Sequence, residues 1–127
     1  MTSRVFILGG YQTDFSQNWD RNGIGLFDAF RSTVQTAFET TALDPEDVEV
    51  AHVGNFAAEL FCRQGHLGGF FAALHPAFSG LPAARHEAAC ASGSIAARAA
   101  AAEIEAGRYG LAAVVGVEQM RNVPGQQ

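Results

Sequence analysis

Cys90 combines a nucleophilic side chain with a position that favours its reactive form. It comes directly before ASGS (91–94), where an extended segment gives way to a helix. The first amides of a helix have no acceptor within the helix, and the helix dipole adds positive charge there. Both effects favour the thiolate over the thiol. Gly93 leaves room beside the sulfur for a bulky group, and nearby amides are suited to stabilising an oxyanion. The pattern predicts acyl transfer through a cysteine nucleophile.

Other interpretations of this stretch stay open at this point. A single cysteine among alanines is also typical of a small buried packing residue. Ser92 and Ser94 are alternative nucleophiles, but the chain lacks a GxSxG pattern, and a serine here more simply caps the helix. Cys62, the second cysteine, precedes a glycine-rich stretch, and we interpret it as a packing residue.

The histidines do not form a metal-binding pattern. His86 lies four residues before Cys90, and in an extended segment this even spacing puts both on one face. We assign His86 a local structural role, with a base toward Cys90 as the alternative. His52, His66 and His75 lack the mutual spacing of zinc ligands, and so do the two cysteines. We therefore expect no metal site.

Periodicity predicts alternating strands and helices. Phe27, Phe30 and Phe38 fall on one face of an amphipathic helix and are expected in the core. The predicted strands or extended segments are 5–8, 48–53, 84–89 and 111–117, and the predicted helices are 24–41 and 91–106. The glycine- and phenylalanine-rich stretch 56–71 reads as a broken helix. This alternation predicts an α/β fold with parallel neighbouring strands.

The helix 91–106 differs from an ordinary surface helix. Small residues surround it, no single apolar stripe is visible, and Gly107 ends it. We expect this alanine-rich helix to be central and packed on several sides.

Composition narrows the function classes. The net charge is −5, and the eight basic residues are all arginines scattered singly along the chain. This argues against nucleic acid as a partner. No apolar run reaches membrane-spanning length, and the N-terminus lacks a signal-peptide pattern. We expect a cytoplasmic protein without a membrane span.

Several motifs, taken in order, resemble the N-terminal half of a thiolase. They are GGYQTDF (9–15), VGN (53–55), HEAACASGS (86–94), EAGRYG (105–110) and VVGVEQM (114–120). The resemblance covers essentially all 127 residues and is closest to the sterol-carrier-protein-type thiolases and their acetyl-CoA acetyltransferase-like relatives.

The resemblance implies both a fold and a reaction. The fold would be the N-terminal half of a thiolase, a mixed, mostly parallel sheet with a central alanine-rich helix. Residues 1–127 would form a partial domain, with the C-terminal half absent from this chain. Cys90, through its side chain and amide, would accept an acyl group from a coenzyme A thioester. Coenzyme A would thus enter as substrate, with no covalently bound cofactor and no metal.

The same resemblance suggests supporting residues. Glu118 would fix a loop near the nucleophile, and Asn55, at a strand end, would do likewise. His66 lies in a stretch that in the family is near the dimer interface and the approach to the active site. Together with His86 and Gly93, these residues complete the candidate site.

The resemblance also places the general base and a second catalytic cysteine in the C-terminal half. The 127 residues alone are therefore expected to be inactive, and to pair with another copy or with a polypeptide that supplies the missing half. Three alternatives remain: a steroid side-chain retro-aldolase-like protein, a ketoacyl-synthase-like protein, and a truncated, non-catalytic assembly subunit.

Overall fold

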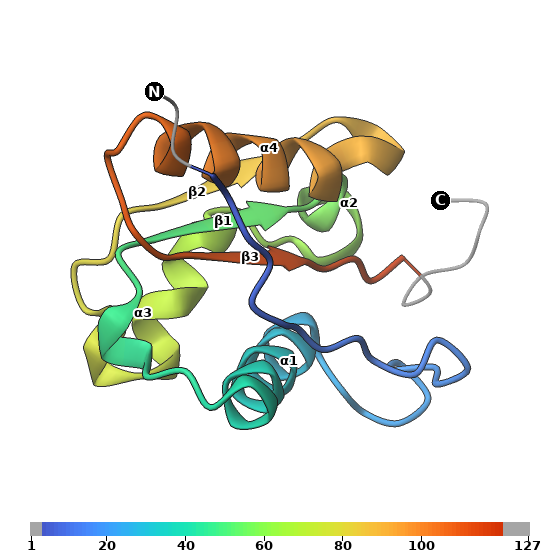
Figure 1. Cartoon of the computed structure of the whole chain (residues 1–127). Helices are drawn as coiled ribbons and strands as arrows, with labels where there is room; N and C mark the ends of the chain where they lie inside the picture. Colours follow the sequence, from blue (N-terminus) through green and yellow to red (C-terminus); the bar gives the residue numbers. More distant parts are fainter. Residues whose placement is uncertain (1–3, 121–127) are drawn as a thin grey trace.

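The chain folds into three layers, with a parallel sheet between helices (Figure 1). The computed structural model describes residues 4–120, so both ends of the predicted 1–127 domain lie outside the described residues. The strands are β1 (Val50–Gly54), β2 (Ala83–His86) and β3 (Ala112–Gly116), in the order β2-β1-β3. The helices are α1 (Leu26–Thr41), α2 (Ala58–Cys62), α3 (Phe70–Leu74) and α4 (Ser92–Glu105). Helix α4 covers one face of the sheet, and α1 and α3 lie beyond the other face.

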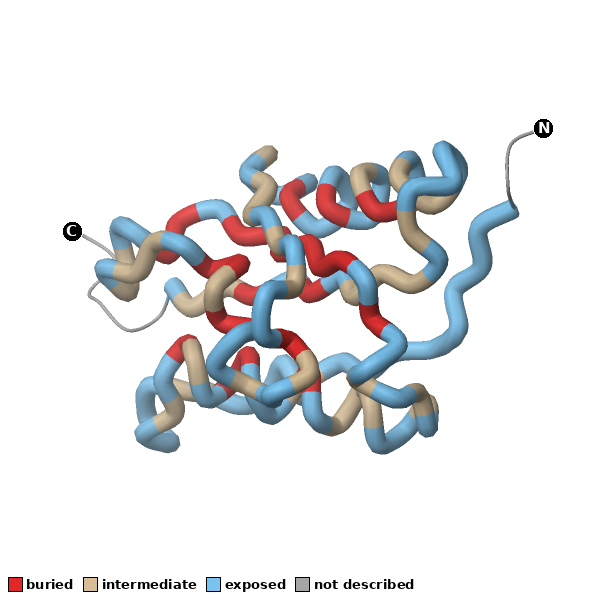
Figure 2. Tube along the Cα trace, turned by 90° about the vertical axis from the view of Figure 1, so that its left-hand side faces the viewer, coloured by how far each residue is buried: buried red, intermediate tan, exposed pale blue. Residues whose placement is uncertain are grey.

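Alternation along β1 separates two different environments. Ala51 and Val53 belong to the hydrophobic core on the side of α1 and α3. His52 and Gly54 face the opposite way, toward α4. Successive side chains of a strand point to opposite faces, so one five-residue strand serves both layers. Figure 2 shows buried residues along the strands and on the helix turns that face them.

Aromatic rings form the core between the sheet and α1. The Phe30 ring is fully buried and meets the rings of Phe70 and Phe71 edge-on, at 5.3 and 5.1 Å between centroids. Phe27 and Phe38 pack around this centre. Edge-to-face rings add to the stabilisation from buried area. The prediction that the phenylalanine stripe is core is confirmed.

Most predicted elements form, with small shifts at their ends. Helix α1 begins at Leu26 instead of residue 24, and β1 begins at Val50 because Pro45–Asp47 form a 3-10 turn before it. The stretch 56–71 is indeed a broken helix, interrupted by the 3-10 turn Leu67–Gly69. The strand β2 ends at His86, and the three strands of residues 4–120 form only parallel pairs.

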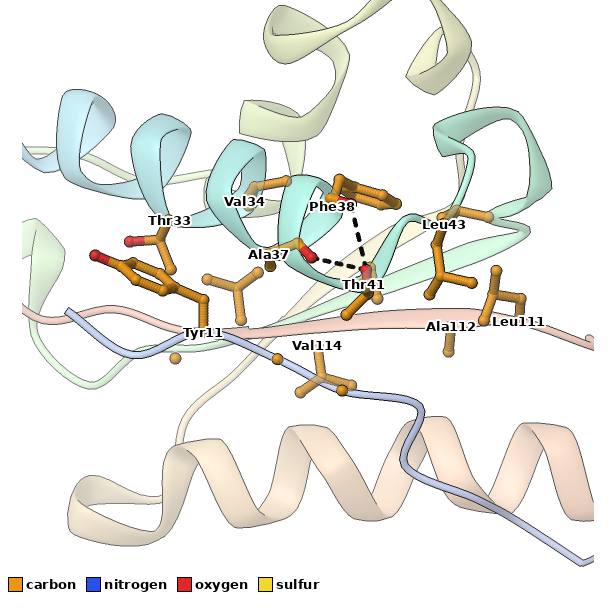
Figure 3. A pocket seen from close by; sticks show the side chains of 16 residues that line it. Tyr11, Thr33, Val34, Ala37, Phe38, Thr41, Leu43, Leu111, Ala112 and Val114 are labelled. Atoms are coloured by element: carbon orange, nitrogen blue, oxygen red, sulfur yellow. Dashed lines mark hydrogen bonds between the residues drawn. The ribbon is translucent and has the colours of Figure 1, made fainter.

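The prediction of a buried strand at residues 5–8 is wrong. This segment makes no strand, and its side chains are exposed, with Ile7 at 94%. A cleft of about 210 Å³ separates the following residues, Gly9–Tyr11, from β3 and α1 (Figure 3). A β-strand needs ladder hydrogen bonds to a neighbour, and among the described residues only β1, β2 and β3 pair in this way. The high β-propensity of residues 5–8 is not enough to form a strand without a neighbouring strand.

Helix α4 meets the expectation of a central helix on one side only. Ser92, Ala96 and Ala100 are buried against the sheet, whereas Ile95 on the outer side is 37% exposed. Within residues 4–120, no helix combines the length and apolarity needed to cross a bilayer.

Candidate active site around Cys90

Cys90 lines a groove at the carboxyl ends of β1 and β3. Its side chain is exposed in the 3-10 turn Ala89–Ala91, which leads directly into α4. The groove has a volume of about 1040 Å³, and residues 13–21 form another of its walls. Ligands of open parallel α/β sheets bind outside the carboxyl ends of the strands. Cys90 is therefore placed where a substrate can reach its sulfur.

Gly54 allows α4 to start close to the sheet. A Cβ built on Gly54 would lie 2.6 Å from both Cα and N of Gly93, and 2.7 Å from the carbonyl carbon of Ser92. Real Cβ atoms do not approach backbone so closely, so only glycine fits at this point. A Cβ on Gly93, in contrast, would meet nothing within 4 Å. Gly93 keeps space open beside Cys90, and Gly54 makes the contact that sets the height of the helix above the sheet.

The turn before Cys90 is held by the side chain of Ser92. Ala89 adopts a left-handed conformation with φ of 49°. The buried Ser92 Oγ accepts a hydrogen bond from the Ala88 N–H at 2.9 Å and donates one to the Ala89 carbonyl at 2.7 Å. Because its proton is engaged and its oxygen is buried, Ser92 is unsuited to act as a nucleophile. The exposed thiol of Cys90 is the better candidate.

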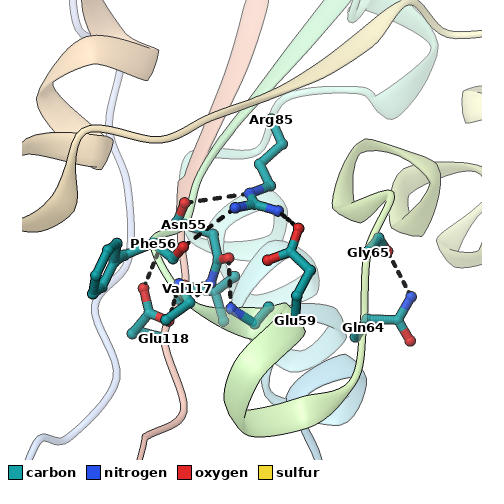
Figure 4. A network of polar contacts seen from close by, with 10 residues as sticks. Asn55, Phe56, Glu59, Gln64, Gly65, Arg85, Val117 and Glu118 are labelled. Atoms are coloured by element: carbon teal, nitrogen blue, oxygen red, sulfur yellow. Dashed lines mark hydrogen bonds and ion pairs between the residues drawn. The ribbon is translucent and has the colours of Figure 1, made fainter.

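Asn55 and Glu118 hold the loop that follows β1. Asn55 is 1% exposed, and its Nδ2 donates to the Val117 carbonyl at 2.8 Å and to Glu118 at 3.1 Å. The Glu118 carboxylate also accepts from the N–H groups of Phe56 and Ala57, at 2.7 and 3.1 Å (Figure 4). One carboxylate thus ties the ends of β1 and β3 together beside the groove that Phe56 and Glu118 line.

Arg85 holds the same loop from its other side. Its guanidinium donates to the carbonyl oxygens of Asn55 and Phe56, at 3.3 and 3.2 Å, and pairs with Glu59. The carbonyls therefore bind a cation while the amides bind the Glu118 anion (Figure 4). Charge-assisted bonds are stronger than neutral ones, so this loop is fixed by two opposite charges.

His86 forms a pair with the buried His52. Its Nε2 lies 2.8 Å from Nδ1 of His52, and His52 Nε2 lies 2.9 Å from a carboxylate oxygen of Glu103 in α4. A carboxylate only accepts, so His52 donates to Glu103 and receives a hydrogen bond from the Nε2–H of His86. Burial is the main cause that lowers the pKa of His86. The pair links β1, β2 and α4, and His86 does not line the Cys90 groove.

The remaining candidates are dispersed. His66 is exposed in the connection between α2 and α3, with φ of 53°, and does not line the groove. The Cys62 thiol lies 3.5 Å from the carbonyl oxygen of Gln119. Residues 4–120 contain no group of three or more His, Cys, Asp or Glu side chains arranged to hold a metal ion.

Gly54, Arg85 and Ser92 were not among the site residues predicted from the sequence. Gly54 belongs to the VGN motif, but its steric role depends on a helix about 40 residues away in sequence. Arg85 was one of eight scattered arginines, and only the strand register brings it to the β1 loop. Ser92 offered a signal, since a hydroxyl at a helix start commonly bonds nearby backbone.

Comparison with known proteins agrees with this architecture. Residues 5–127 match the family model of the thiolase N-terminal domain. An acetyl-CoA acetyltransferase of Methanocaldococcus jannaschii is 37% identical over 123 residues, and one of Methanothermobacter thermautotrophicus is 32% identical over 119 residues. Each alignment covers 94% of this chain but only 29% and 30% of the relative, respectively. The chain belongs to the thiolase family, and the match lies in the N-terminal domain of that family.

Proposed function

We propose that the protein takes part in thiolase-type acyl transfer, moving an acyl group between coenzyme A and an acyl or 3-ketoacyl thioester through acyl-Cys90. The observation that supports this most is the exposed Cys90 thiol at the start of α4, beside a groove large enough for a thioester. The names of the two relatives agree with acetyl-CoA as an acyl donor.

The proposed reaction has two stages. The Cys90 thiolate attacks the thioester carbonyl carbon, and the carbonyl electron pair moves onto the oxygen. The resulting oxyanion is stabilised by the Cys90 amide N–H, then collapses and expels the coenzyme A thiolate. A coenzyme A thiolate or a carbanion then attacks the acyl carbon of acyl-Cys90, the bond from that carbon to Sγ breaks, and the Cys90 thiolate is released.

The surrounding residues support this chemistry by fixing the groove. Asn55 and Glu118 hold the Phe56 loop, and Gly93 keeps space for the acyl group. The general base and second cysteine implied by the family belong, in our proposal, to a further polypeptide segment or partner. We also propose an oligomer and a cytoplasmic location.

Acetylation of Cys90 tests the proposal. The protein is incubated with acetyl-CoA, and peptide mass spectrometry locates any acetyl group that hydroxylamine releases. We expect a thioester on Cys90, its loss in Cys90→Ala, and its persistence in the matched control Cys62→Ala. Iodoacetamide should label Cys90 before Cys62, because Cys62 is partly buried.

Two outcomes would contradict this function. Preferential labelling of Cys62 would remove Cys90 as the reactive thiol. A Cys90 that reacts with iodoacetamide but never with acetyl-CoA, even with a co-expressed C-terminal half from a relative, would favour the non-catalytic or retro-aldolase alternatives.

A further inference from the structure

We infer that Ser92 is a positioning residue whose hydroxyl aims the amide N–H of Cys90 into the groove. The inference rests on the proposed function, in that Cys90 is taken as the nucleophile and its amide as an oxyanion donor. It assigns Ser92 a task in the reaction without contact to the substrate.

The hydrogen bonds of Ser92 fall on both sides of one strained residue. Ser92 Oγ binds the peptide N–H of Ala88 and the carbonyl of Ala89, at 2.9 and 2.7 Å. Ala89 between them has φ of 49°, a left-handed conformation that a residue with a Cβ rarely adopts. Only 4% of Ser92 is exposed, so water cannot readily replace these bonds. The backbone N–H of Ser92 also donates to the Ala89 carbonyl, so the hydroxyl adds a second hydrogen bond to that acceptor and a further one to Ala88.

The second of these bonds orients the peptide that includes the Cys90 amide. The carbonyl of Ala89 and the N–H of Cys90 belong to the same peptide plane. All peptide bonds within residues 4–120 are trans, so these two groups point in opposite directions. The carbonyl points at the Ser92 hydroxyl, and the Cys90 N–H therefore points away from that hydroxyl. Cys90 lines the groove with an exposed side chain, and the inference is that its amide N–H faces the same space.

A role in orienting an oxyanion donor can be separated from a general role in folding. Acylation by p-nitrophenyl acetate passes through a tetrahedral oxyanion: Sγ bonds to the acyl carbon, and p-nitrophenolate leaves with its electron pair. Alkylation by iodoacetamide is a direct displacement in which Sγ bonds to carbon and iodide leaves. Only the first reaction needs the amide donor, so the ratio of the two rates at Cys90 reports donor orientation.

The test measures this rate ratio by peptide mass spectrometry in the 127-residue protein. In Ser92→Ala we expect the acylation-to-alkylation ratio to fall at least about tenfold, since removing an oxyanion donor outright costs about 10²–10³ in rate. The matched control Ser94→Ala, an exposed serine on the same helical turn, should keep the wild-type ratio. Alkylation of Cys62 serves as an internal reference.

Two substitutions of equal size separate the loss of the Ser92 hydroxyl from a general folding defect. Ser92→Thr retains the hydroxyl and Ser92→Val lacks it, while both add the same bulk. We expect the Val variant to show a ratio about tenfold below that of the Thr variant. A wild-type ratio in folded Ser92→Ala, or equal ratios in the Thr and Val variants, would overturn the inference. Because p-nitrophenyl acetate needs no coenzyme A site, failure of the proposed function appears separately, as absent acetylation by acetyl-CoA.

Discussion

Because Gly54 lies against the first turn of α4, we predict opposite changes in the free energy of unfolding when Gly54 or Gly93 is replaced by alanine. Adding a methyl group at Gly54 places a carbon 2.6 to 2.7 Å from three backbone atoms of Ser92 and Gly93. An ordinary contact begins at 3.4 Å, so strand and helix must separate by roughly 0.8 Å, the difference between 3.4 and 2.6 Å. Neither partner is a flexible side chain, so no rotamer change relieves the overlap.

The expected loss of stability in Gly54→Ala is the cost of overpacking minus the gain from restricting the unfolded chain. An extra methyl group in a tight site costs up to about 3 kcal/mol. Replacing glycine restricts the unfolded chain and returns about 0.4–1 kcal/mol. We expect Gly54→Ala to lower the free energy of unfolding by about 2 kcal/mol. For a domain of this size the melting temperature should fall by roughly 7 °C.

Thermal unfolding followed by circular dichroism measures this change, with Gly93→Ala as the matched control. Gly93 lies within α4, and a Cβ there would meet nothing within 4 Å. Alanine should therefore raise the free energy of unfolding by about 0.5–1 kcal/mol. If Gly54→Ala melts at or above the wild-type temperature, or Gly93→Ala melts below it, the close approach of strand and helix is not as described.

Two further predictions concern charged groups. Glu118→Ala should lower the free energy of unfolding by about 2 kcal/mol, because two amide N–H groups and Asn55 lose a charged acceptor. Urea unfolding measures this change. The control Glu105→Ala, at an exposed position, should change the free energy of unfolding by less than about 0.5 kcal/mol. Burial lowers the pKa of His86 below 6.5, so the stability from its neutral form is complete above pH 6.5 and is lost as the pH falls through the folded-state pKa. In His86→Gln the free energy of unfolding should therefore fall less as the pH is lowered, whereas the exposed control His66→Asn should behave like wild type. An equal loss of stability at low pH in all three proteins would refute the assignment.

The local elements of this fold were accessible from the sequence. The three- and four-residue spacing of Phe27, Phe30 and Phe38 is a property of helix geometry, so α1 and its buried face could be predicted. The short apolar segments that form β1 and β3 each end at a glycine, and their apolar runs predicted them as strands. Residues 5–8 show the limit of that reasoning, because a strand also requires a neighbour at hydrogen-bonding distance.

The candidate site also has features that the sequence predicts and features that only tertiary contacts decide. The sequence alone predicts that Cys90 lies at the start of a helix, because Cys90 and the residues directly after it define that position. The strand register and the crossover connections decided which distant groups meet, and short-range patterns do not encode these. Only the tertiary structure placed Gly54 under α4, Arg85 on the β1 loop and His86 against His52. The sequence therefore indicated Cys90 as the proposed nucleophile and predicted the helix after it, and the tertiary structure decided the contacts that hold them in place.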